Sequence, residues 1–238
     1  MKMTLTVASN RIKVRIDATN RGTESAQNLR VFLYIFNRTL TSEVLDRLKK
    51  EETRSFDFEI PKPTEKRGRF AFTGEVLFHD ANNHPFSALA CNTFNIRYNQ
   101  SPQFAGHIPH LTIKEKGKLR IQVINLTSGN RTSRVLLRLP HGLISPVNPK
   151  SLKLGPYGKS EVNFQIENRY GIGAATYPFF CILEDKSGKV HYAEILGSTI
   201  QVKEFKNWFH RTKWYWLAGI VPIILCWIVV LLFRRKTQ

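Results

Sequence analysis

Histidine and cysteine side chains at two places in this chain have the types that bind metal ions. His107 and His110 lie three residues apart in a proline-containing stretch, and both imidazoles could contact one ion. No nearby cysteine or paired acid completes that ligand set. His84 and Cys91 are similar to part of a copper-binding sandwich, but no second histidine follows Cys91 closely, and both methionines lie near the start of the chain. The sequence therefore predicts no metal site and no cofactor.

Two aspartates recur at matching places and could form an acid–base pair. Asp80 and Asp185 each begin a polar turn. Such a carboxylate usually accepts hydrogen bonds from its own turn, and equivalent positions in two separate units need not face each other. The sequence contains no G-x-x-x-x-G-K-[ST], G-x-S-x-G, H-E-x-x-H or C-x-x-C motif. We therefore predict no catalytic residue and no enzymatic activity, and keep an enzyme with an unrecognised site as a third hypothesis.

The elements that position these side chains recur with a period near 105 residues. Val14-Arg15-Ile16 followed by Asn20 matches Leu119-Arg120-Ile121 followed by Asn125. With one extra residue in the second copy, three alternating apolar positions also match: Phe56, Phe58 and Ile60 align with Val162, Phe164 and Ile166. An ordered series of matches at nearly constant offset predicts a duplicated fold unit.

Each unit carries the pattern of short, half-buried strands. Apolar and polar residues alternate, and turn residues separate about seven such segments per hundred residues, which is typical of an immunoglobulin-like sandwich. Thr41–Glu52 is the exception, because its apolar residues have helical spacing and predict a short helical turn. We predict an all-β fold of two tandem immunoglobulin-like β-sandwiches followed by one C-terminal transmembrane α-helix. The predicted parts are sandwich 1 (1–98), a linker (99–110), sandwich 2 (111–203), a basic-aromatic juxtamembrane segment (204–213), the transmembrane helix (214–233) and a basic tail (234–238).

The predicted transmembrane helix has no charged side chain over twenty residues. At about 1.5 Å per residue, twenty helical residues span roughly 30 Å, the thickness of a bilayer's hydrocarbon core. We expect side chains at its ends to lie at the membrane interface: Trp208, Lys213, Trp214, Tyr215, Trp216, Trp227, Arg234, Arg235 and Lys236. Small residues and a proline predict a face where another helix could pack: Ala218, Gly219, Pro222 and Cys226.

Cys91 and Cys181 are expected to be buried free thiols.

The chain is strongly basic, with a formal net charge of +18. Residues 1–106 contribute +5 and residues 107–213 contribute +10, so the more basic half adjoins the predicted anchor. Anionic headgroups attract juxtamembrane lysine and arginine, which makes an acidic lipid surface the expected partner. A basic helix, zinc-finger spacing and a clustered aromatic platform are absent from the sequence, so nucleic acid is not an expected partner.

The pattern resembles the Ig-like modules of bacterial and archaeal surface proteins, of the CARDB-type and NPCBM-associated kinds. Asn20-Arg21-Gly22 followed by Ala26 and Leu29 carries the first resemblance, and Leu154-Gly155-Pro156-Tyr157-Gly158-Lys159-Ser160 the second. Such modules often precede one C-terminal helix and an Arg-rich tail. The resemblance implies a binding or spacer module and carries over no catalytic residue.

These observations favour a non-catalytic scaffold that presents two sandwiches at a membrane and binds a partner protein or glycan. An accessory subunit of a membrane enzyme or transport complex is the alternative. The module resemblance favours sandwiches outside the cytoplasm. No signal peptide is evident after Met1, which favours the other alternative, a tail-anchored cytoplasmic adaptor.

Overall fold

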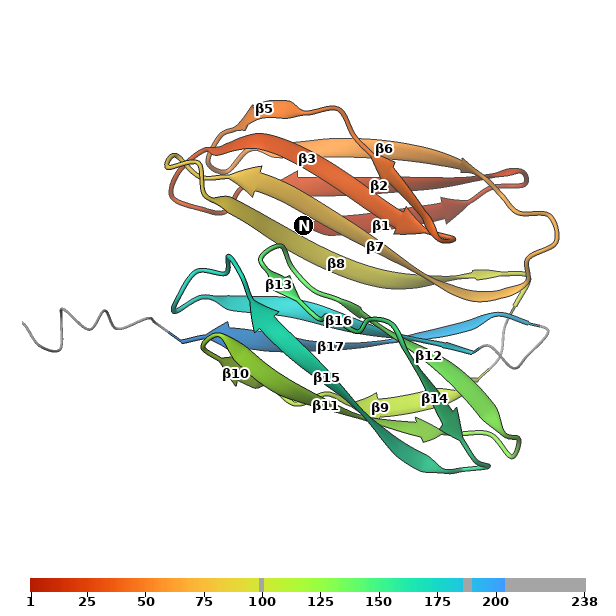
Figure 1. Cartoon of the computed structure of the whole chain (residues 1–238). Helices are drawn as coiled ribbons and strands as arrows, with labels where there is room; N and C mark the ends of the chain where they lie inside the picture. Colours follow the sequence, from red (N-terminus) through yellow and green to blue (C-terminus); the bar gives the residue numbers. More distant parts are fainter. Residues whose placement is uncertain (99–100, 186–189, 204–238) are drawn as a thin grey trace, which may run out of the picture. The chain divides into compact units, whose positions relative to one another are not determined.

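The computed structural model describes residues 1–98, 101–185 and 190–203. These residues form strands, turns and loops, with no helix among them, which confirms the all-β prediction. Met1–Lys203 make one compact unit. Figure 1 shows strands β1–β8 in red to yellow and strands β9–β17 in yellow-green to blue.

The first sandwich is built from two antiparallel sheets. One sheet has the order β1-β2-β6, and the other has the order β4-β3-β7-β8 with β5 also paired to β3. The strands are β1 (Lys2–Val7), β2 (Arg11–Thr19), β3 (Ala26–Ile35), β4 (Arg38–Thr41), β5 (Leu45–Leu48), β6 (Thr53–Pro61), β7 (Gly68–His79) and β8 (Pro85–Ile96).

The second sandwich repeats this plan with extra edge strands. Its sheets have the orders β13-β15-β11-β9 and β10-β17-β16-β12-β14, and β10 joins β17 in parallel. The strands are β9 (Phe104–His107), β10 (Leu111–Ile113), β11 (Lys116–Asn125), β12 (Arg131–Arg138), β13 (Leu143–Ile144), β14 (Lys150–Leu154), β15 (Lys159–Asn168), β16 (Thr176–Asp185) and β17 (Tyr192–Val202).

Alternation along the strands places one apolar row in each core. On β2 the buried positions are Ile12, Val14 and Ile16, each with at most 1% of its surface exposed, while the residues between them face solvent. On β11 the equivalent positions are Leu119 and Ile121, both fully buried. Since side chains alternate between the two faces of a strand, this period of two fixes which face packs inward.

Strand register bears out the repeat seen in the sequence. Val14 pairs with Phe58 between β2 and β6, and Leu119 pairs with Phe164 between β11 and β15. The next pairs in register are Ile16 with Phe56 and Ile121 with Val162. The aligned residues therefore occupy the same rungs of equivalent strand pairs.

Asn20 and Asn125 make the same set of hydrogen bonds in the two sandwiches. Each Oδ1 accepts from the backbone N–H two residues later, at 2.9 Å in Asn20 and 3.0 Å in Asn125. Each Nδ2 donates to the carbonyl four residues later. Each also donates to a carbonyl distant in the sequence, that of Leu48 for Asn20 and that of Gly155 for Asn125. One asparagine in each unit thus joins the loop at the end of β2 or of β11 to a separate segment.

Two segments differ from the sequence-based expectation. The helical turn predicted for Thr41–Glu52 is wrong: Leu45–Leu48 form β5, where Leu48 pairs with Ala26 and is 2% exposed. Core packing and pairing with β3 override the helical spacing. Within the predicted linker 99–110, Phe104–His107 form β9, which pairs with β11.

The predicted interfacial and helix-packing residues, from Trp208 to Lys236, lie outside the described residues, as does the whole segment 204–238. Among the residues that the structure describes, no helix has the length and apolar character needed to cross a membrane.

Candidate functional site

The two sandwiches contact each other directly through β7 and β8 on one side and β16 and β17 on the other. Arg69 N–H donates to the His191 carbonyl at 3.0 Å, and His191 N–H donates to the Arg67 carbonyl at 3.0 Å. The Arg69 guanidinium also pairs with Glu194 at 3.2 Å. Gly68, between these contacts, has a φ of 134° and approaches His191 more closely than a residue with a Cβ could.

The outer faces of two sheets form the walls of a cleft beside this interface. Val135 and Leu137 on β12 point into the core and are at most 2% exposed, so Arg134, Leu136 and Arg138 point outward on the opposite face. The same alternation turns Tyr34 outward on β3. The two walls thus come from different sandwiches.

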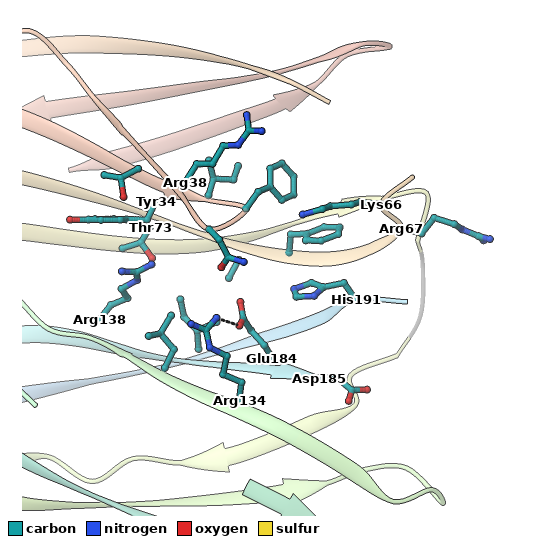
Figure 2. A pocket seen from close by; sticks show the side chains of 18 of the residues that line it. Tyr34, Arg38, Lys66, Arg67, Thr73, Arg134, Arg138, Glu184, Asp185 and His191 are labelled. Atoms are coloured by element: carbon teal, nitrogen blue, oxygen red, sulfur yellow. Dashed lines mark hydrogen bonds and ion pairs between the residues drawn. The ribbon is translucent and has the colours of Figure 1, made fainter. Parts of the chain in front are cut away.

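This inter-sandwich cleft has a volume of about 920 Å³. Five of its lining residues are basic and three are acidic; Figure 2 shows most of the lining side chains. The lining residues are Tyr34–Thr39, Glu65–Arg67, Phe70, Ala71, Thr73, Arg134, Leu136, Arg138, Ile182, Glu184, Asp185 and His191.

Arg138 lies over the aromatic ring of Tyr34, with Cζ 4.4 Å from the ring centroid. The Tyr34 hydroxyl donates to Glu75 at 2.8 Å, and burial together with this carboxylate raises the pKa of Tyr34 to about 12. Burial lowers the pKa of Arg138, although an arginine remains charged near neutral pH. Arg138 Nε is buried and has no hydrogen-bond partner among the residues that the structure describes.

The acidic side chains of the cleft floor are already engaged. Glu184 pairs with Arg134 at 2.8 Å, and Asp185 pairs with Arg131 at 2.7 Å. At the other end of the cleft the His191 ring stacks on Phe70, with centroids 4.5 Å apart. The pKa of the His191 imidazole is lowered, mainly because the ring is buried. The carboxylates of Glu184 and Asp185 are therefore both paired with arginines. The Arg138 guanidinium, in contrast, forms no ion pair with the described residues.

Cys91 and Cys181 are free thiols on strands that face each other across the interface. Cys181 is fully buried, as the sequence predicts, whereas Cys91 is only partly buried and lies 3.3 Å from the Thr73 hydroxyl. Burial raises the pKa of both thiols, that of Cys91 to about 11. Thiolate chemistry at neutral pH is therefore suppressed at both sites.

We expect the protein to lose stability as the pH rises from about 9 to about 11. In the unfolded chain the Cys91 thiol ionises near its ordinary pKa of 9.0, whereas the native thiol keeps its proton to about pH 11. The native state thus binds the proton more tightly, and rising pH favours unfolding by roughly 2–3 kcal/mol for this group. Urea unfolding at pH 7.5 and pH 11, compared between the wild type and Cys91→Ala, measures the effect; an equal pH dependence in both proteins would contradict it.

The residues considered for chemistry from the sequence fall in separate places. Asp80 accepts the backbone N–H groups of Asn82 and His84 at 2.9 and 2.8 Å, which confirms its predicted role as a turn cap. These backbone hydrogen bonds lower the pKa of Asp80, and the one from His84 has the largest effect. Asp185 pairs with Arg131 at 2.7 Å, and the turn in which it was predicted to be a cap lies outside the described residues.

His110 Nδ1 lies 2.7 Å from the Thr199 hydroxyl, and His107 is exposed. Within residues 1–98, 101–185 and 190–203, no group of three or more histidine, cysteine, aspartate or glutamate side chains could hold a metal ion.

The cleft residues could not be recognised from the sequence, because their outward positions on the strands have the same pattern as ordinary solvent-facing positions. One signal was present: Cys181-Ile182-Leu183 puts apolar side chains on both faces of β16. A strand that is apolar on both faces is covered on both faces. Ile182 is 3% exposed and lines the cleft, on the side of the sheet away from the core of its own sandwich.

No protein-family model matches this chain, and no curated protein matches it. Native alpha-2-macroglobulin from Escherichia coli, from domain MG7 to its C-terminus, is similar at 13% identity with a TM-score of 0.36, over 42% of this chain and 16% of that chain. An ASH/PapD-like domain of human CEP192 is similar at 10% identity with a TM-score of 0.34, over 48% of this chain and 96% of that domain.

Red sea bream transglutaminase is similar at 10% identity with a TM-score of 0.26, over 83% of this chain and 31% of that chain. This chain thus spans a minor part of the alpha-2-macroglobulin and transglutaminase structures. Because these TM-scores lie below 0.5, the β-sandwich assignment rests on the strand pairing described above.

Proposed function

We propose that this chain is a non-catalytic, membrane-anchored binding protein that presents its two sandwiches as one unit at a membrane surface. The observation that carries the binding function is the inter-sandwich cleft. It is large enough for a small ligand or a protruding side chain of a partner, and most of its lining residues lie on strands, although residues 36–37 and 65–67 lie in loops. Strand-borne side chains hold a ligand in a more defined geometry than loop-borne ones.

The pairing of strands supports reading both sandwiches as immunoglobulin-like modules. In the first sandwich β1, β2 and β6 form one sheet, and β3, β7 and β8 belong to the other. In the second, β9, β11 and β15 belong to one sheet, and β12, β16 and β17 to the other, a division similar to that of immunoglobulin-like folds. The proposed relation to surface modules of the CARDB and NPCBM-associated kinds agrees with this arrangement. Such modules bind or space other domains, which is consistent with a scaffold.

The uncharged stretch Trp214–Phe233, followed by Arg234-Arg235-Lys236, supports membrane anchoring. We expect the full chain to stay in the membrane pellet after alkaline carbonate extraction, because the apolar segment is integrated in the bilayer. Replacing Ile224 and Val229 by arginine should move most of the protein to the supernatant, since each charge near the bilayer centre costs about 2.5–3.5 kcal/mol on insertion scales. Replacing the same two residues by alanine is the matched control, and a pellet that also keeps the arginine variant would contradict anchoring.

The proposed location is a single-pass membrane protein whose sandwiches lie outside the cytoplasm and contact anionic lipid. Protease protection on sealed, right-side-out vesicles tests this orientation: cleavage of the sandwiches without permeabilisation supports it, and protection favours the tail-anchored cytoplasmic adaptor.

Copurification from mild detergent distinguishes the scaffold from an accessory subunit. A stoichiometric set of other membrane proteins would support the subunit role, for which Gly219 and its small neighbours offer a packing face.

A further inference from the structure

We propose that Arg138 anchors an oxyanion, a phosphate or carboxylate group carried by a small polar ligand, in the inter-sandwich cleft. This inference rests on the binding function proposed above and names its ligand class. The site consists of Arg138 on β12, with Tyr34 beneath its guanidinium and the two cavities that meet there.

The charge of Arg138 lacks a direct partner within the described part of the chain. Its guanidinium forms no ion pair there, and its Nε has no acceptor. The neighbouring carboxylates are occupied: Glu75 accepts the Tyr34 hydroxyl at 2.8 Å, and Glu184 accepts Arg134 at 2.8 Å. A partly buried charge without a paired counter-charge is costly, so an incoming oxyanion gains more here than at an exposed arginine.

Two cavities converge on Arg138 and leave room for such a ligand. Tyr34 and Arg138 line both the large cleft and a second cavity of about 270 Å³. The second cavity is also lined by Ser145, whose hydroxyl is buried and has no hydrogen-bond partner in the described part of the chain. A hydroxyl can donate to an oxyanion, so an unused donor lies in the same cavity as the guanidinium.

The surroundings of Arg138 favour an anion over a cation or an apolar ligand. The arginine lies over the face of Tyr34, which holds the guanidinium plane in place. The other walls of the large cleft add Lys66, whose Nζ lies 4.9 Å from the Phe36 ring centroid. Figure 2 shows Arg138 reaching toward Tyr34 and Thr73, while Arg134 turns toward Glu184. Arg134 is thus neutralised and Arg138 is not.

The Tyr34–Glu75 hydrogen bond has a specific role in this proposal. It holds the Glu75 carboxylate on a neutral donor and so keeps it from pairing with the guanidinium. Tyr34→Phe retains the aromatic ring beneath Arg138 but releases Glu75. The freed carboxylate then competes with the ligand for Arg138, so the variant should bind anions several-fold more weakly.

Isothermal titration calorimetry on the full chain in a neutral polyoxyethylene detergent, at constant ionic strength and without phosphate buffer, tests the proposal. The probes are inorganic phosphate, sodium glucuronate and, as a neutral control, glucose. We expect phosphate or glucuronate to bind and glucose not to bind, and the stronger of the two anions identifies the ligand chemistry. Arg138→Gln should weaken that binding at least about tenfold, the loss of about 1.4 kcal/mol expected for a charge-assisted contact. Arg120→Gln, on the sheet away from the cleft, should leave it unchanged.

Absence of binding by both anions, or equal binding by the wild type and Arg138→Gln, would overturn the proposal. Circular dichroism establishes that each variant is folded. Should Arg138→Gln fail to fold, Tyr34→Phe and Arg138→Lys decide the question, since the lysine keeps the charge without the planar fork. Unchanged binding in both of these variants would also overturn it. Carbonate extraction is independent of all these readouts, so failure of the anion site leaves the test of membrane anchoring intact.

Discussion

Gly68→Ala should destabilise the protein by about 3–5 kcal/mol. A Cβ at this position would lie 1.9 Å from the carbonyl oxygen of His191 and 2.7 Å from its carbonyl carbon. Both atoms are backbone, so no side-chain rotation relieves the clash. The φ of 134° is also a conformation that side chains with a Cβ rarely adopt, and strain and overpacking each cost about 1–3 kcal/mol. The substitution therefore forces β7 away from His191.

Chemical unfolding followed by far-ultraviolet circular dichroism measures this effect on the full chain. Tryptophan fluorescence is unsuitable, because the four tryptophans all lie at or beyond residue 208. Gly129→Ala and Gly155→Ala are matched controls, because a Cβ at either position has no atom of the described residues within 4 Å. Equal midpoints for Gly68→Ala and these controls would show that the approach of Gly68 to His191 is not close in solution.

Asn125→Ala should cost about 3 kcal/mol, and the equivalent Asn20→Ala only about 1 kcal/mol. The Asn125 side chain donates to the Gly129 and Gly155 carbonyls, both at 2.7 Å, and accepts from the backbone and hydroxyl of Thr127. Asn125 is fully buried, so truncation leaves several polar groups without partners or water, at about 1–3 kcal/mol each. Partial relaxation of the loop reduces the sum.

Asn20 makes the equivalent hydrogen bonds except the one from a hydroxyl, because Gly22 stands where Thr127 does. Its loop is partly exposed, so water can replace the lost amide. The two alanine variants thus compare nearly the same hydrogen-bond arrangement at two degrees of burial. Asn125→Asp adds a second test, since a carboxylate would face two carbonyl oxygens and should destabilise at least as much as alanine. A larger loss from Asn20→Ala than from Asn125→Ala would refute the burial argument. Urea midpoints for all three variants give the comparison.

The sequence was sufficient for the architecture wherever one face of a strand is buried. Alternation on β2 and β11, and the constant offset between Val14 and Leu119, predicted equivalent strands whose registers agree in the structure. Asp80 could be recognised as a turn cap because its hydrogen bonds go to residues two and four positions away. Local chemistry and periodicity are both readable from a single chain.

The cleft could not be predicted in the same way, because it depends on how two sandwiches dock. Arg134 and Arg138 occupy outward positions on β12, and nothing in their spacing distinguishes a solvent-facing arginine from one that faces another sheet. Tyr34, which completes the pair with Arg138, lies 104 positions earlier in the chain. The prediction of a helical turn at β5 was wrong for a related reason, since pairing with β3 outweighs the helical spacing of the apolar residues there.

The walls of the cleft belong to different sandwiches, so ligand binding and sandwich docking are thermodynamically linked. A ligand that contacts both walls binds only the docked arrangement, and it stabilises that arrangement by an amount that grows with its concentration. Reciprocally, a substitution that weakens docking lowers the apparent affinity for the ligand, even where the substituted residue makes no contact with the ligand. Ligand binding would then change the cooperativity of thermal unfolding. In a weakly docked variant the two sandwiches would unfold in separate transitions without ligand, and in a single transition when the ligand is bound.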